Sequence, residues 1–141
     1  QNQAGSGGGI FLDSKEGPAD ANLYDCIIED NTARFGCGGG ILSHGSGSIV
    51  SLRGTTRLSQ NLAKKAGVGI SLEYGSSLIL EGGQNLYDGF FLQDADTHLY
   101  LQNTLHPNAC IRLYSNISVF SLQTQKNSEC LPVDLMAGNS A

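Results

Sequence analysis

Asp94, Asp96 and His98 occupy alternate positions of one short segment. In an extended strand such residues share a face, so two carboxylates and an imidazole would meet there as a metal site or an acid–base pair. The segment lies between predicted strands that end at Leu92 and begin at Leu99, where a corner of the chain is expected and where aspartate is a common turn former. We therefore expect a solvated turn rather than a metal site, with these three residues as the candidates if a metal binds.

The four cysteines fall into two pairs. Cys110 and Cys130 are about 20 residues apart, which is the length of one short repeat, and each lies immediately before an alternating apolar pair. If these pairs stack as neighbouring strands, the two cysteines lie about 4.8 Å apart, within the roughly 4.4–6.8 Å between Cα atoms that a disulfide accepts. We expect that disulfide. Cys26 and Cys37 could form a second one, although a small buried residue explains Cys37 equally well.

Composition and charge narrow the function classes. The chain has 141 residues, 40% of them hydrophobic and 15% charged, with 19 glycines and a formal net charge of −5. The absence of a basic run argues against nucleic acid as a partner. No apolar stretch approaches the roughly 18 residues of a membrane span. The apolar content predicts a folded chain, and its length predicts a single domain over residues 1–141.

An internal repeat indicates the architecture. The segments 7–12, 38–43 and 67–72 read GGGIFL, GGGILS and GVGISL, so one motif recurs about every 30 residues. Apolar pairs then continue at steps of about 20 residues, with the alternation of strands that bury one face. One series is Ile70/Leu72, Phe90/Leu92, Ile111/Leu113 and Leu131/Val133, and the other is Leu78/Leu80, Leu99/Leu101 and Phe120/Leu122.

These patterns predict an all-β right-handed parallel β-helix, or β-solenoid, in which one full circuit of the chain is a rung. We expect five or six rungs, each of roughly 20–31 residues. Long Gly-rich rungs would cover positions 1–87, and compact rungs of about 20–21 residues would cover positions 88–141. A helical solenoid does not fit, because no segment has an apolar period near 3.6.

A recurrent asparagine precedes each Gly-rich segment, at Asn2, Asn31 and Asn61. Asparagine tolerates left-handed dihedrals at a sharp corner, and its amide can bond the asparagine of the next rung. We therefore expect an asparagine ladder parallel to the axis, with a structural role.

A family resemblance follows from these motifs. The GGGI segments, with IEDN at residues 28–31 and LSQN at 58–61, resemble the GGA[ILV] and FxxN repeats of chlamydial-type polymorphic outer membrane proteins. More broadly they resemble pectin-lyase-like β-helices of secreted proteins. The resemblance covers residues 1–72, with Gly where that family has Ala and Ile or Leu where it has Phe. Because members of that family are surface-displayed adhesins, the resemblance implies an adhesive role.

Four cysteines, a single methionine and the sequon at Asn116 favour an extracellular or cell-surface location, with Asn116 as the glycosylation candidate. The chain opens at Gln1 inside a repeat, which predicts a processed piece of a longer protein or a polymer-forming unit. The open ends of a coil expose unpaired strand edges, so the expected partners are a second copy stacked end to end, or adjoining rungs of a longer chain. A glycan or a host surface is a further expected partner.

The alternative function is a carbohydrate-binding or polysaccharide-degrading β-helix. Tyr74 and Tyr114 would lie two rungs apart near one edge, with Asp94 between them, and could stack on sugar rings. An enzyme of this kind needs several acidic residues, or a basic pair, gathered on one face, whereas the strand positions offer Arg112 alone. We therefore assign no catalytic residue and no cofactor, and we favour a stalk, an adhesin passenger or a filament subunit.

Overall fold

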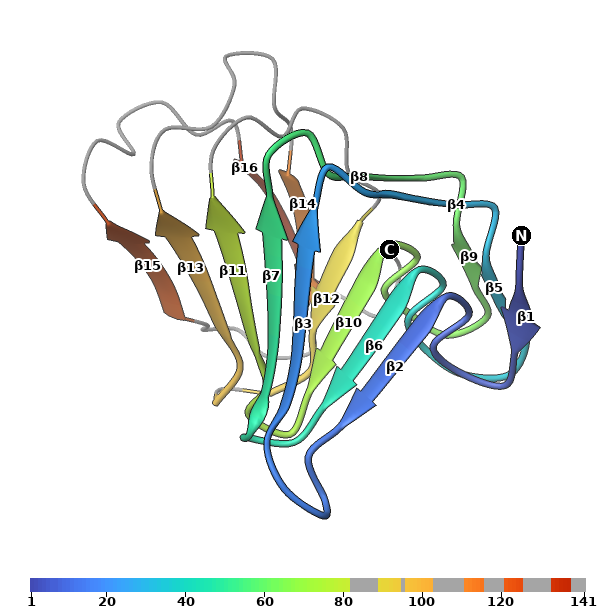
Figure 1. The fold of residues 1–141 in the computed structure, drawn as a ribbon, viewed down its shortest axis with the longest axis horizontal. Helices are drawn as coiled ribbons and strands as arrows, with labels where there is room; N and C mark the ends of the chain where they lie inside the picture. Colours follow the sequence, from blue (N-terminus) through green and yellow to red (C-terminus); the bar gives the residue numbers. More distant parts are fainter. Residues whose placement is uncertain (82–88, 95, 103–110, 116–120, 126–132, 138–141) are drawn as a thin grey trace.

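The structure is a computed structural model that describes residues 1–81, 89–94, 96–102, 111–115, 121–125 and 133–137. Within these segments the chain forms sixteen strands and no helix, and the strands lie in four sheets (Figure 1). The fold class is therefore all-β, as the alternating apolar pairs predict.

Two of the sheets are large. The six-stranded sheet contains, in spatial order, β16 (Val133–Ala137), β14 (Ile111–Ser115), β12 (Phe90–Leu92), β10 (Ile70–Glu73), β6 (Ile41–His44) and β2 (Ile10–Asp13). The five-stranded sheet contains β15 (Ser121–Gln125), β13 (His98–Gln102), β11 (Ser77–Glu81), β7 (Ser48–Arg53) and β3 (Ala19–Tyr24). The three-stranded sheet contains β1 (Gln3–Ala4), β5 (Thr32–Ala33) and β9 (Leu62–Ala63), and the two-stranded sheet contains β4 (Ile27–Glu29) and β8 (Arg57–Ser59).

Every strand pair among the described residues is parallel, and the chain visits the sheets in a repeating order. From β2 to β9 it passes twice through the six-, five-, two- and three-stranded sheets in turn. Ile10 pairs with Ile41, Ile41 with Ile70, and Ile70 with Phe90. The Gly-rich repeats and the first compact step therefore have the register that the sequence predicts.

The register of the later strands differs from the sequence prediction. Phe90 pairs with Leu113 instead of Ile111, and Ile111 pairs with Val133 instead of Leu131. Leu99 likewise pairs with Leu122 instead of Phe120, so each of these steps is longer than predicted by two positions. Such a shift leaves every side chain on its original face of the sheet, so apolar alternation alone does not distinguish between the two registers.

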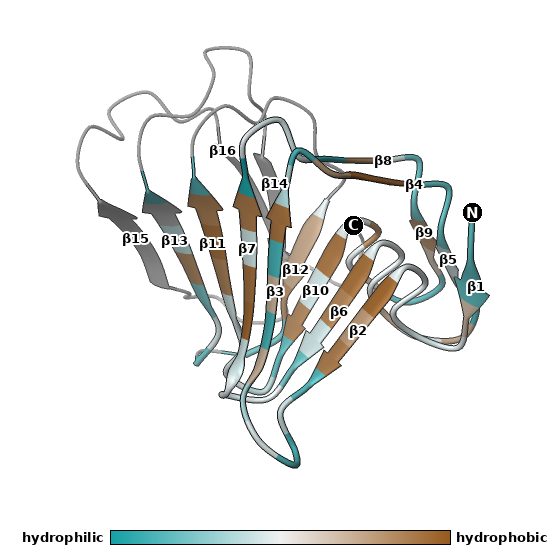
Figure 2. Cartoon of the chain, in the orientation of Figure 1, coloured by the Kyte–Doolittle hydropathy of each residue, from teal (hydrophilic) through white to brown (hydrophobic). Residues whose placement is uncertain are grey.

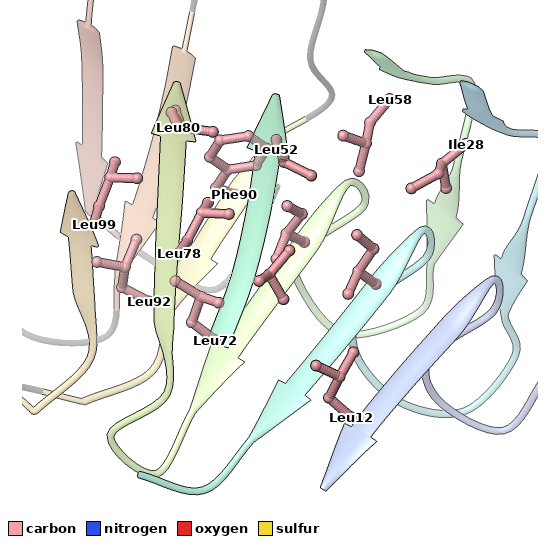
Figure 3. Packing of buried hydrophobic residues seen from close by; sticks show 13 residues of the cluster. Leu12, Ile28, Leu52, Leu58, Leu72, Leu78, Leu80, Phe90, Leu92 and Leu99 are labelled. Atoms are coloured by element: carbon pink, nitrogen blue, oxygen red, sulfur yellow. The ribbon is translucent and has the colours of Figure 1, made fainter. Parts of the chain in front are cut away.

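The core is a continuous column of aliphatic side chains, with Phe90 among them, between the sheets (Figure 3). Hydrophobic residues concentrate in the strands, and hydrophilic residues concentrate in the connections (Figure 2). Each fully buried leucine or isoleucine contributes about 1.5–3 kcal/mol relative to an exposed one. The largest members of the column, all without exposed surface or nearly so, are Ile41, Leu52, Leu58, Ile70, Leu72, Leu78, Leu80, Phe90, Leu92 and Leu99.

The outer side of the six-stranded sheet is also covered in its middle. Leu42 and Phe91 alternate with core residues on their strands, yet they are only 5% and 3% exposed. The chain before β6 folds tightly onto this side, which requires glycine at two positions there. Gly38 has φ +70°, and a Cβ on Gly39 would lie 2.4 Å from the carbonyl oxygen of Val68. The GGGI motif is thus explained by the close approach of backbone to backbone.

One polar side chain in the core has no hydrogen-bond partner among the described residues. Ser43 pairs with Leu12 and Leu72 in the ladder, is fully buried, and has no partner for its Oγ. A buried hydroxyl without a partner costs about 1–3 kcal/mol, so Ser43→Ala is expected to raise the free energy of unfolding by about 1 kcal/mol. Urea unfolding measures this change.

The matched control for that prediction is Ser48, which is also fully buried, but whose Oγ donates to the carbonyl oxygen of His44 at 2.7 Å. Ser48→Ala should lower the free energy of unfolding by about 1 kcal/mol. If both substitutions lower the free energy of unfolding, the Ser43 hydroxyl has a hydrogen-bond partner in solution and the prediction is wrong.

Candidate functional site

A pocket lies where the chain passes from the six-stranded to the five-stranded sheet. It has a volume of about 780 Å³ and is open to solvent, and we call it the corner pocket. Three successive connections form it, namely β6–β7, β10–β11 and β12–β13, together with the first residues of β11 and β13. The residues that line it include Ser46, Tyr74, Gln93, Asp94, Asp96 and His98.

Asp94 holds the corner together. Its carboxylate accepts the backbone N–H of Tyr74 at 2.7 Å, that of Gly75 at 3.3 Å and that of Asp96 at 3.1 Å. Tyr74 and Gly75 have φ of +53° and +77°, a left-handed conformation that a non-glycine residue adopts at some cost. The carboxylate of one repeat therefore fixes the strained corner of the preceding repeat.

Asp94, Asp96 and His98, the candidate metal ligands, lie where the β12–β13 connection enters β13. Asp94 and Asp96 lie in the connection, and only His98 belongs to a strand, so the three residues do not share a strand face. The Asp94 oxygens are engaged by backbone N–H groups. The described residues contain no group of three or more His, Cys, Asp or Glu side chains able to hold a metal ion.

Tyr74 is 60% exposed at the rim of this pocket. Its ring centroid lies 4.5 Å from that of His44 on the preceding repeat, with 52° between the ring planes. His44 Nδ1 in turn lies 3.4 Å from a carboxylate oxygen of Asp13, one repeat earlier. Residues of three successive repeats are thus in contact along this corner.

The predicted row of Tyr74, Asp94 and Tyr114 is confirmed for Tyr74 and Asp94, which are in contact, and is wrong for Tyr114. Tyr114 pairs with Phe91, and Phe91 pairs with Ser71, so Tyr114 belongs to a position three residues before Tyr74. The register shift described above is the cause. The pair of tyrosines proposed to stack on a sugar chain therefore does not share an edge.

The structure brings the three recurrent asparagines together. Asn2 Nδ2 donates to Asn31 Oδ1, and Asn31 Nδ2 donates to Asn61 Oδ1, each at 3.1 Å. Asn31 and Asn61 are buried, at 4% and 3% exposed. The left-handed residues at this corner are Asp30 and Gln60, with φ of +56° and +58°, rather than the asparagines that were expected to adopt this conformation. The asparagines are free to stack because the preceding residue makes the bend.

Cys26 and Cys37 are both free thiols, so the second disulfide is not formed. Cys26 lies between β3 and β4 and its Sγ donates to the carbonyl oxygen of Tyr24, whereas Cys37 follows β5 in another connection. Burial, reinforced by the neighbouring carboxylate of Glu73, raises the pKa of the Cys37 thiol. Since the thiolate is the reactive form, this cysteine is a poor nucleophile at neutral pH.

The predictions for Cys110, Cys130 and Asn116 concern residues outside the described segments. The predicted Cys110–Cys130 disulfide assumed that Ile111 pairs with Leu131, whereas Ile111 pairs with Val133. That premise is therefore wrong, and the disulfide stays a prediction from the sequence alone.

Reasoning from the sequence did not identify Ser46 and Gln93 as site residues. Each is an ordinary polar residue of a connection, and they meet Tyr74 only through the parallel stacking of three repeats. The usable signal was the register between repeats, which places the three connections side by side.

Within the described part of the chain there is no helix long and apolar enough to cross a membrane. Comparison of the chain with family models, with curated proteins and with solved structures gave no match.

Proposed function

We propose that the chain is a right-handed parallel β-helix that serves as an extracellular or cell-surface scaffold with an adhesive role. The observation that carries this proposal is the register. Equivalent positions of successive repeats pair in parallel in all four sheets. A chain that returns to the same position at each repeat builds an elongated object of stacked rungs.

Two further features support a scaffold. The stacked asparagines and the aliphatic column stabilise the interior through contacts between neighbouring repeats. The connections can then vary in length, since positions 14–18 join β2 to β3 whereas positions 45–47 alone join β6 to β7. Variable loops on a rigid framework are the usual place for recognition.

The proposed partner at the ends of the coil is another rung of the same kind. β2 and β3 are the outermost strands of their sheets on one side, and Phe11, Tyr24 and Ile27 are exposed there. Unpaired strand edges take up further strands readily. We propose that this rung comes from a second copy stacked end to end or from an adjoining part of a longer chain. Sedimentation at increasing protein concentration tests self-association. If the protein stays monomeric at every concentration, stacking of a second copy is ruled out and the rung has to come from a longer chain.

An in-register deletion tests the coil itself. Removing residues 32–61 joins Asn31 directly to Leu62, the position that pairs with Thr32. In a coil the flanking rungs restack, so the shortened protein is expected to unfold cooperatively and to keep a strand-rich circular dichroism spectrum. The control deletes residues 32–46, which removes β5 and β6 and leaves β2 and β10 without the strand that pairs with both, so it should be clearly less stable than the in-register deletion. If the two shortened proteins are equally stable, the stacked-rung proposal is wrong.

The surface role has its own test. Cells that produce the protein are treated with a protease that does not enter them. Loss of the chain from intact cells supports surface display, and full protection of the chain contradicts it.

A further inference from the structure

We infer that the corner pocket binds a guanidinium group, as carried by an arginine side chain of a partner protein. This inference names a ligand for a site on the proposed scaffold, but its argument uses the pocket alone and does not depend on the coil. It rests on an exposed aromatic ring, on two hydrogen-bond acceptors without a donor and on the charge of the lining.

The ring of Tyr74 offers a stacking surface in a fixed position. It is 60% exposed, and its backbone N–H is held by Asp94 at 2.7 Å. His44 contacts the ring with a centroid separation of 4.5 Å, which further restricts its orientation. A planar cation gains both stacking and cation–π attraction on such a ring, and the rigid corner reduces the entropy lost on binding.

The polar lining contains two acceptors that no described residue fills. Asp96 is exposed, and no described residue donates a hydrogen bond to its carboxylate. Gln93 Oε1 is buried and has no donor among the described residues, so it also lacks a partner. A guanidinium carries five N–H donors and no acceptor, so it can fill both of these acceptors.

The charge of the pocket lining also favours a cationic ligand. Among the described residues that line the pocket there are two aspartates and neither lysine nor arginine, so no cation of this lining competes for their carboxylates. The net charge of −5 for the whole chain also draws basic partners towards it at long range. The described groups that would repel a cation here are His98 and the nearby His44, when protonated.

The experiment compares two peptides by NMR titration of the full chain. One is acetyl-Gly-Arg-Gly-amide, and the other replaces arginine by citrulline, which has nearly the same shape but no charge. We expect the arginine peptide to bind at least about fivefold more tightly and to lose affinity as salt is added. Asp96→Asn and Tyr74→Asn should each weaken its binding by about two- to fivefold. Asparagine is chosen at 74 because it tolerates the left-handed conformation.

The matched control is Asp20→Asn, which removes an exposed aspartate of β3 that does not line the pocket. Its affinity for the arginine peptide should equal that of the unchanged chain. Equal binding of the two peptides would overturn the inference, as would an Asp20 variant weakened as much as the Asp96 variant. A lysine peptide that binds as tightly would show a general cation site, and a neutral oligosaccharide that displaces the arginine peptide would show a sugar site. Either result would replace the guanidinium assignment.

Discussion

Asn31→Ala is expected to lower the free energy of unfolding by about 2–4 kcal/mol, because it removes three hydrogen bonds made by one buried side chain. Asn31 is 4% exposed and bonds in both directions. Its Oδ1 accepts from the backbone N–H of Asn2 at 3.0 Å and from Asn2 Nδ2 at 3.1 Å, and its Nδ2 donates to Asn61 Oδ1. Alanine removes all three bonds and brings no water to the site. Urea unfolding followed by circular dichroism measures the change.

Asn22→Ala is the control for this prediction. Asn22 lies on β3 with its side chain exposed, so its removal should change stability by less than about 0.5 kcal/mol. Equal effects at the two positions would mean that the stacked amides do not stabilise the fold. In that case the recurrence of asparagine would need an explanation based on the backbone of the corner alone.

Gly39→Ala should destabilise the protein by about 3 kcal/mol, because the added Cβ clashes with neighbouring backbone atoms and no side-chain rotation can relieve the clash. The added Cβ would lie 2.4 Å from the carbonyl oxygen of Val68 and 2.5 Å from that of Leu62. Both atoms belong to paired parts of the next repeat, so the two repeats would have to move apart. Thermal and urea unfolding of the variant measure the loss.

Gly5→Ala serves as the matched variant, because a Cβ at that position has no atom within 4 Å. It should leave stability nearly unchanged, and the contrast isolates the contact from the general effect of replacing glycine by alanine. The sequence itself carries a natural comparison, because Val68 occupies the position equivalent to Gly39 one repeat later. If Gly39→Ala is as stable as Gly5→Ala, neighbouring repeats are further apart in solution than in the structure.

Much of the fold could be predicted because the repeat is visible in the letters of the sequence. Ile10, Ile41 and Ile70 carry the same motif, and they do pair in parallel. After Phe90 the motif is lost and only the apolar alternation remains. That alternation repeats at every second residue, so it fixes the buried face of each strand but not which apolar residue pairs with which.

The site was less predictable, for a related reason. Tyr74, Asp94, Asp96 and His98 could each be singled out by residue type. Their arrangement depends on the corner, where Asp94 engages N–H groups of the preceding repeat. The proximity of Cys37 and Glu73 has the same origin, since the two residues belong to different repeats. Composition and spacing give no direct measure of such contacts.

The short span of the strand pairs has a consequence for how the protein folds. No pair of described strands joins residues further apart in the chain than Ile10 and Ile41. The entropy lost on closing each loop depends on that distance and not on the length of the whole chain. Each added repeat therefore costs the same loop-closure entropy as the one before it. Folding does not become more difficult as the chain lengthens. A protein built this way can gain or lose length by whole repeats without a new folding problem.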